Sequence, residues 1–449
     1  MDNASDPTIR RVYLNGQAIK RTTGSTGTMN SPGGNFYLGN SGTWDASAFP
    51  GKLDEVRISN VARSDDWVRA TYDTVMANDF AQYEEAALRN DWNKYARKFT
   101  VTFKNYTGKS TLTDFPVLVK LSASALDGFS YADFKKPNGG DLRFSDEAGN
   151  ILPSEVDCWD MNGISCVWVK VPELNANTKI RGYYGWAPAP DVDATAVWDS
   201  DYMAVWHLNA AASATTQRDS TENAITLTEF QPSHTRSVEP GVLGVVGSAA
   251  RFGLQEQFTG SYYYEDSDGG LSGFSAFTLE SWSYQEDHAP ADAPRDSYYI
   301  HYRGTSQKLY GMFEYNHNGK TIFIIYPDGS TYKDLYAGED IEKPSPASWN
   351  YHAFSFNGST GTRTGFLNGN NVVHSTDAQY QVTLPSFGGT LYVGNSKEWN
   401  GNAPSGKLDE VRISNVARSD DWIKATYDTI AGDLATIRPW NIPTRIIVR

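Results

Sequence analysis

Three acidic residues fall within six positions in the stretch Glu155-Val-Asp-Cys-Trp-Asp160. If this stretch is a strand, Glu155 and Asp157 point to the same face, because side chains alternate along a strand. Two carboxyl groups about 5–5.5 Å apart can hydrolyse a glycosidic bond, one as the nucleophile and the other as the acid. Asp160 would point to the opposite face unless a bulge intervened. The spacing therefore raises the hypothesis of a glycoside hydrolase that uses Glu155 and Asp157.

Two cysteines, Cys158 and Cys166, flank a hairpin signal at residues 160–163, which ends in Asn-Gly. A three-residue loop of residues 161–163 would place the cysteines directly opposite each other, where they could form a disulfide. A two-residue Asn-Gly loop would instead place Cys166 opposite Trp159 and leave two thiols. A disulfide here would cross-link the two strands of one hairpin, as is common in an oxidising compartment, and would have no bearing on catalysis.

A third group of residues could bind a ligand without reacting with it. Residues 297–336 are rich in tyrosine, and aromatic faces on a rigid sheet suit the apolar faces of sugar rings. The alternative is core packing, since tyrosine is common in strands for that reason alone. The residues predicted to contact a glycan are Trp399, Tyr298, Tyr302, Tyr326 and Tyr332.

Composition narrows the class of protein that could carry these groups. A net charge of −14 and a pI near 5 argue against nucleic-acid binding, which needs clustered cations. No apolar stretch approaches the roughly 18 residues of a membrane span. Thirteen Trp, 26 Tyr and 39 Gly predict an all-β, turn-rich chain in an extracellular, cell-surface or periplasmic setting. His207 and His352 are predicted to be core histidines whose ring nitrogens are satisfied.

The chain contains one stretch of seventeen residues twice, from Gly51 to Trp67 and from Gly406 to Trp422. In the second copy, Asp409, Val411 and Ile413 alternate with polar residues, which predicts a half-buried strand. Asp409 would then share the apolar face, where an unpaired carboxylate is costly. Backbone donors, a partner side chain or a cation must compensate its charge.

A helix is expected directly after this strand. Ser419 is a predicted N-cap, and Asp420 and Asp421 would lie in the first turn, where the helix dipole favours negative charge. Apolar residues then recur from Ile423 to Ile430 at helical spacing, which predicts a short amphipathic helix.

The repeat defines the expected domains. Residues 1–80 hold the strands 11–14, 36–38 and 53–58 and the short helix, but they lack the first half of a sandwich. We therefore expect Met1 to be a fragment boundary, or a neighbouring molecule to supply the missing strands. A helical linker is expected over residues 81–97, a small sandwich over 98–200, a complete sandwich over 201–432 and a tail of unassigned role over 433–449.

Motifs in the small sandwich resemble a known family. Asp141-Leu-Arg-Phe144, Val167-Trp-Val-Lys-Val-Pro172 and Tyr183-Tyr-Gly-Trp186 are similar to those of the bacterial domain of unknown function 2341. The resemblance implies a β-sandwich of about a hundred residues and brings no established chemistry with it.

Residues 201–432 resemble the concanavalin A-like, laminin-G-type jelly roll. The likeness is carried by Ala204-Val-Trp-His-Leu-Asn209, by Phe277-Thr-Leu-Glu-Ser-Trp282 and by the Gly406-Lys-Leu-Asp-Glu-Val-Arg-Ile413 ending. It implies a structural calcium ion between early and late loops, with Asp219 and Asp409 as metal ligands. The alternative is that Asp219 caps a turn and that Asp409 accepts backbone N–H groups.

The resemblance also weakens the hydrolase hypothesis. Jelly-roll glucanases carry the signature Glu-x-Asp-x-x-Glu, whereas this chain has Asp160 in the last position and has the motif in the smaller sandwich. Acidic residues at a hairpin edge are the favoured interpretation.

The sequence thus predicts an all-β, extracellular, non-catalytic repeat protein whose jelly roll binds carbohydrate or another surface ligand. The alternative is a structural spacer or self-assembling protein completed by strand exchange between copies, and a third hypothesis is the hydrolase. Predicted partners are a glycan and further copies of the chain, without nucleic acid or membrane insertion.

Overall fold

The protein folds into two compact units, Met1–Ala87 and Leu88–Arg449, each of which is described by itself. The computed structural model describes residues 9–23, 38, 51–53, 55–59, 61–76, 91–124, 126, 128–230, 238–252, 262–265, 270–286, 297–304, 308–315, 320–331, 333–336, 347–394, 406–432 and 434–439. Among these residues, helices are short, and none has the length and apolar character needed to cross a membrane.

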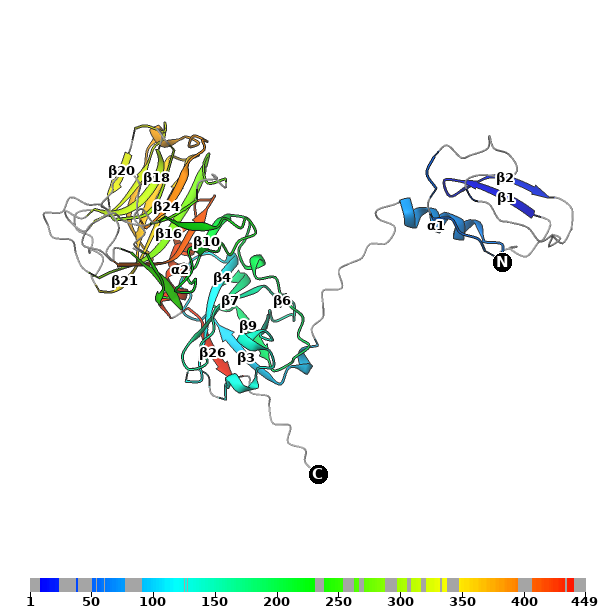
Figure 1. Cartoon of the computed structure of the whole chain (residues 1–449), viewed down its shortest axis with the longest axis horizontal. Coiled ribbons are helices and arrows are strands. Elements are labelled where there is room, and N and C mark those ends of the chain that lie inside the picture. Colours follow the sequence, from blue (N-terminus) through cyan, green and yellow to red (C-terminus); the bar gives the residue numbers. More distant parts are fainter. Residues whose placement is uncertain are drawn as a thin grey trace, which may run out of the picture. The chain divides into compact units, whose positions relative to one another are not determined.

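The second unit begins with a small β-sandwich (Figure 1). One of its sheets has the order β26 (Thr436–Pro439), β3 (Arg97–Thr102), β9 (Lys179–Tyr184), β5 (Arg143–Ser145) and β6 (Ile151–Leu152). The other has the order β4 (Leu112–Leu121), β8 (Ser165–Leu174) and β7 (Ser154–Cys158). The tail, whose role the sequence left open, therefore supplies β26, an edge strand that returns to the small sandwich after the jelly roll is complete.

The remainder of the second unit is an antiparallel jelly roll. The first sheet runs β13 (Glu239–Leu243), β14 (Ser248–Phe252), β25 (Gly406–Ser414), β16 (Ala276–Gln285), β21 (Trp349–Asn357), β22 (Thr362–Leu367) and β23 (Asn370–Thr376), with β10 (Tyr202–Trp206) paired to β25. The second runs β11 (Thr216–Gln217), β12 (Leu227–Phe230), β15 (Tyr262–Glu265), β24 (Thr390–Val393), β17 (Ser297–Arg303), β18 (Lys308–Tyr315), β19 (Lys320–Ile325) and β20 (Lys333–Tyr336). The all-β sandwich expected from the composition is confirmed.

The helix α2 (Asp420–Ala431) joins the two sandwiches, and Figure 1 shows it where they meet. Its Ile423 and Ile430 belong to a core that also holds Phe115 of β4. The hydroxyl of Thr429 accepts a hydrogen bond of 2.8 Å from the backbone N–H of Leu118. Because the helix is buried against both sandwiches, the second unit behaves as one body.

Strand β25 differs from its prediction. The alternation predicted a strand buried on one face, but nearly every residue from Gly406 to Ser414 is buried. Leu408, Val411 and Ile413 face the jelly-roll core, whereas Glu410 and Arg412 face the small sandwich. The second face is buried because another domain covers it, which a single-strand pattern does not reveal.

The first unit repeats the end of the jelly roll. Strands β1 (Ile9–Leu14) and β2 (Gln17–Thr23) form a hairpin, and α1 (Asp65–Met76) matches α2 position for position. The strand expected over residues 53–58 is not found among the described residues, since 53 and 55–59 have no strand pairing. The linker expected over 81–97 lies mostly outside the described residues, and Trp92–Lys94 forms a 3₁₀ turn.

Candidate functional site

A β-bulge at Asp157 begins the site. Val156 is paired with Val167 and Cys158 with Cys166, so Asp157 is an extra residue between two regular pairs of β7 and β8. Bulges redirect side chains and are common beside functional sites. The sequence left a bulge open only for Asp160; the bulge lies at Asp157, and the side chains of Glu155 and Asp157 both reach one imidazole ring.

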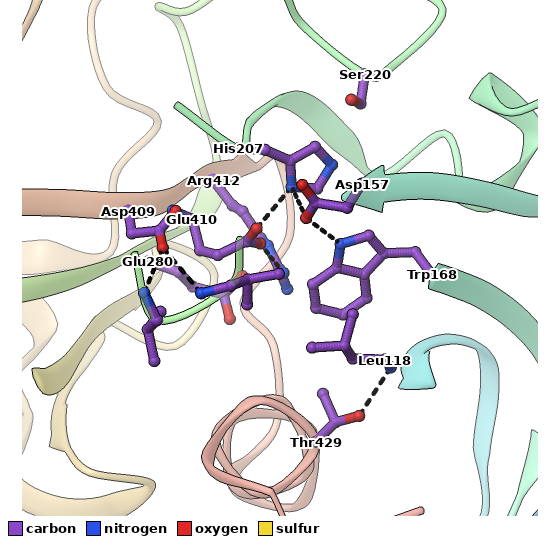
Figure 2. A network of polar contacts seen from close by, with 12 residues as sticks. Leu118, Asp157, Trp168, His207, Ser220, Glu280, Asp409, Glu410, Arg412 and Thr429 are labelled. Atoms are coloured by element: carbon purple, nitrogen blue, oxygen red, sulfur yellow. Dashed lines mark hydrogen bonds and ion pairs between the residues drawn. The ribbon is translucent and has the colours of Figure 1, made fainter. Parts of the chain in front are cut away.

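That ring belongs to His207, which follows β10 of the jelly roll (Figure 2). Its Nδ1 lies 2.7 Å from Oε1 of Glu410 and 3.4 Å from Oδ2 of Asp157. Its Nε2 lies 3.4 Å from Oε2 of Glu155. His207 therefore contacts acids from both sandwiches and is 3% exposed. The sequence predicted a core histidine whose ring nitrogens have hydrogen-bond partners. The ring is buried as predicted, and its partners are three carboxylates.

The surroundings fix the charges of this cluster. Burial alone would lower the pKa of His207, but Glu410, Asp157 and Glu155 together raise it well above its usual value. Burial would raise the pKa of Glu410, but His207 and Arg412 lower it to about 2. His207 is thus a buried cation whose charge the acids balance.

Asp157 and Glu155 respond differently to burial. Burial raises the pKa of Asp157 to about 6, an effect that Glu410 reinforces and that His207 opposes. Burial also acts to raise the pKa of Glu155, but hydrogen bonds from His207, Trp198 and Ser220 outweigh it, so that this pKa is lowered. Of the three acids around His207, Asp157 is therefore the one whose pKa is raised.

A buried arginine completes the cluster. One guanidinium nitrogen of Arg412 lies 2.5 Å from Oε2 of Glu410. Its guanidinium carbon is 4.6 Å from the ring centre of Trp168 and 5.1 Å from that of Trp198. Arg412 lies on β25 and both tryptophans belong to the small-sandwich side, so cation–π contacts also connect the domains.

Backbone conformation places Glu410. It has φ +51°, a left-handed value that is uncommon for a residue other than glycine. The register of β25 against β16 shifts at this point, so Glu410 lies in a bulge. Its backbone N–H donates to Oδ1 of Asp409, and Oδ2 of Asp409 accepts from the N–H groups of Val245 and Val246. Asp409 therefore holds both the bulge and the turn between β13 and β14.

That turn forms one wall of a pocket of about 680 Å³ between the two sandwiches. The opposite wall is the hairpin of β7 and β8, with Trp159 and Asp160. Asn209 also lines it and donates a hydrogen bond of 2.7 Å to Oδ1 of Asp157. Asp157 belongs to both the cluster and the pocket wall, and its side chain is buried in the cluster, so the cluster holds the strand that lines the pocket.

Three of these groups, Asp157, His207 and Glu410, offer ligand atoms within 4.8 Å of one another. A metal ion would need a ring nitrogen of His207 with a free lone pair. The neighbouring acids raise the pKa of the ring well above its usual value, so a metal ion would have to displace a proton from His207 before it could bind there.

The predicted calcium ligands are buried and hydrogen-bonded. Both oxygens of Asp219 accept two hydrogen bonds each, from Val205, from the backbone and hydroxyl of Thr221, and from Ile225. These donors use the lone pairs that a calcium ion would need. Calcium binding at Asp219 and Asp409 stays a prediction.

The predicted aromatic surface needs correction. Tyr302 is 0% exposed and donates its hydroxyl to the carbonyl of Phe387, and Tyr326 is 6% exposed. Tyr302 belongs to the core between the two sheets, because a strand in a two-layer sandwich places alternate residues there. Tyr326 is buried in a separate small cluster with Ile322 and Ile324. Trp399 and Tyr332, and the side chain of Tyr298, lie outside the described residues.

The two cysteines lie directly opposite each other, as a three-residue loop predicted, and both are free thiols. The disulfide stays a prediction. Trp159, His207 and Asn209 belong to the site but were not predicted as site residues. The only available signal was the resemblance at residues 204–209, which contains two of them.

Comparison with known proteins supports the fold. The family described as the concanavalin A-like lectin/glucanases superfamily matches residues 3–69 and 258–424, together more than half of the chain. The domain of unknown function 2341 matches residues 138–208. A search of curated proteins found no match.

Similar solved structures include the binding domain of Paraclostridial Mosquitocidal Protein 1, at 13% identity and a TM-score of 0.39, with 51% of this chain and 52% of that chain covered. The receptor binding domain of botulinum neurotoxin C/D mosaic serotype is similar at 12% identity and a TM-score of 0.38, with 51% of each chain covered. This chain thus spans about half the length of these structures. On the family match, the chain belongs to the concanavalin A-like lectin/glucanase superfamily.

Proposed function

We propose that this protein is a non-catalytic recognition protein, extracellular, on a cell surface or in the periplasm, whose interdomain pocket binds a carbohydrate. The observation that carries the proposal is the pocket of about 680 Å³, whose wall combines Trp159 with the polar side chains of Asp160, Asn209 and Lys120. Sugars present apolar C–H faces and polar edges, which an aromatic ring and hydrogen-bonding groups match.

The surroundings of Glu155 support binding without hydrolysis. Glu155 is 7% exposed, and its carboxylate accepts hydrogen bonds from Trp198 Nε1 at 2.8 Å and from Ser220 Oγ at 2.7 Å. Asp157 is held by Trp168 and Asn209. A retaining pair must reach the anomeric carbon with both carboxyl groups, whereas Glu155 does not line the pocket.

The test is a glycan array probed with the full chain, followed by calorimetry on the sugars that bind. Trp159→Ala should weaken binding at least tenfold, about 1.4 kcal/mol, and Trp159→Phe should retain most of it. Trp349→Ala is the matched control, because Trp349 is also half-buried but lies outside the pocket.

Trp159 packs against Tyr131 and Phe134, so the melting temperature of each variant must be measured as well. Asn209→Ala, at an exposed position of the same pocket, provides a second variant with little packing to lose. Binding that survives both changes would move the glycan site elsewhere. Sugar release that disappears in Glu155→Gln would instead support the hydrolase.

A further inference from the structure

The first unit carries a second copy of the segment that closes the jelly roll, with the helix formed and the strand unpaired. We call residues 406–431 the closing segment and residues 51–76 its copy. The two differ only in the pairs Val68 and Ile423, Arg69 and Lys424, Val75 and Ile430, and Met76 and Ala431.

The copy has the local geometry of the closing segment. Glu55 has φ +49° and Glu410 has φ +51°, so the bulge conformation is present in both. A Cβ at Gly16 would lie 2.9 Å from Cβ of Tyr72, and a Cβ at Gly369 would lie 2.9 Å from Cβ of Tyr427. The hairpin turn therefore packs on the same position of the helix in each unit.

The two differ in what covers their apolar residues. The matched residues are exposed in the copy and buried in the closing segment: Leu53 is 50% exposed and Leu408 0%, Val56 49% and Val411 0%, Ile58 75% and Ile413 0%, and Trp67 41% and Trp422 6%. A row of exposed aliphatic side chains is a surface that another chain can cover.

The jelly roll shows which partner fits. Around the closing segment, β25 pairs with β10, β14 and β16, all antiparallel. Val411 lies opposite Trp206, and Ile413 lies opposite Leu279. Strands with the sequences of β10, β14 and β16 are therefore complementary to the apolar side chains of the copy.

We propose that the copy binds the jelly roll of a second copy of this chain, in the place that the closing segment occupies between β10, β14 and β16. This is β-strand addition, in which backbone hydrogen bonds give affinity and side-chain pockets give specificity. Beyond glycan recognition, it makes the protein competent to assemble by exchange of closing segments.

The polar contacts around the place between β10, β14 and β16, here called the slot, also favour the copy as the segment that binds there. Glu55 stands where Glu410 meets His207, and Arg57 stands where Arg412 lies between Trp168 and Trp198. An unrelated apolar peptide would leave Nδ1 of His207 without the carboxylate that Glu410 places 2.7 Å from it. The copy brings that carboxylate with it.

The test uses the full chain with its own closing segment disabled by Val411→Asp and Ile413→Asp. The jelly roll should stay folded, with the copy from a second chain in the slot. Sedimentation should then give a dimer or larger species of 49.7 kDa chains. Amide exchange at residues 55–59 should slow at least tenfold relative to the unaltered chain.

Val56→Asp with Ile58→Asp is the matched control, which should leave the mass and melting of the jelly roll unchanged. Combining all four changes should abolish the jelly roll. The proposal is overturned if the 411/413 variant loses the jelly roll as completely as the fourfold variant does. It is equally overturned if the folded 411/413 variant is monomeric, or if residues 55–59 stay unprotected in it.

Discussion

Nδ1 of His207 lies 2.7 Å from Oε1 of Glu410, and both side chains are buried, at 3% and 1% exposure. The other ring nitrogen faces Glu155 of the small sandwich. One imidazole ring therefore connects the closing strand of the jelly roll to the neighbouring domain. Because a buried charge needs its partners, we expect the two sandwiches to melt in one transition.

Glu410→Gln should strongly destabilise the second unit. It removes the carboxylate that pairs with both His207 and Arg412, and breaking a buried pair costs about 3–5 kcal/mol. Glu55→Gln is the matched control at the same position of the repeat, where the pair with Arg57 is exposed, and should cost at most about 1 kcal/mol. Urea denaturation measures both, and equal losses would contradict the burial argument.

Asp157 should make stability depend on pH. Its pKa of about 6 in the folded chain exceeds the ordinary value of 3.8, so the folded state binds the proton more tightly. The stabilisation is complete below about pH 4 and is lost as pH rises through 6. The pKa difference corresponds to about 3 kcal/mol.

The measurement is the free energy of unfolding from pH 3 to 7 for the wild type and for Asp157→Asn. Their difference should change by about 3 kcal/mol across this range. Glu410, whose pKa is lowered, contributes with the opposite sign in both proteins. Asp160→Asn, at an exposed position of the same hairpin, is the control, and its free energy of unfolding should vary with pH as that of the wild type does. If the curve of Asp157→Asn also runs parallel to the wild type, the raised pKa of Asp157 is refuted.

Ser64 and Ser419 should contribute equally to their helices. Each hydroxyl accepts a hydrogen bond from the backbone N–H three residues on, at 3.1 Å from Trp67 and 3.2 Å from Trp422. Replacing either serine with alanine should cost about 1 kcal/mol of local helix stability. Amide exchange in each helix measures the loss, and a loss confined to Ser419→Ala would show that α1 is not capped locally.

Asp219→Asn distinguishes a hydrogen-bonded role from a calcium site. The amide nitrogen would face N–H and O–H donors, so a loss of about 1–3 kcal/mol is expected. If Asp219 only accepts hydrogen bonds, the variant loses the same free energy of unfolding in EDTA and in millimolar calcium. A loss seen only with calcium present would place the ion at Asp219.

Much of the fold follows from sequence periodicity. Strand β25 and helix α2 lie where alternating residues and apolar residues at helical spacing predict them. The site does not follow in this way. His207, Glu155 and Glu410 are separated by long stretches of chain, and only the docking of one sandwich on the other brings them together.

The repeat separates local from tertiary information within one chain. The helices span Asp65–Met76 and Asp420–Ala431, equivalent bounds in both copies, because a serine cap and early acidic residues are local signals that act in any context. The identical residues before them form a nine-residue strand only in the jelly roll. The sequence by itself determined the helix and the left-handed backbone at Glu55 and Glu410, which are the same in both copies. The tertiary structure decided the strand, its burial and the cluster of charged residues beside it. The reason is that a strand needs partners for its backbone hydrogen bonds and a second layer to cover its apolar face.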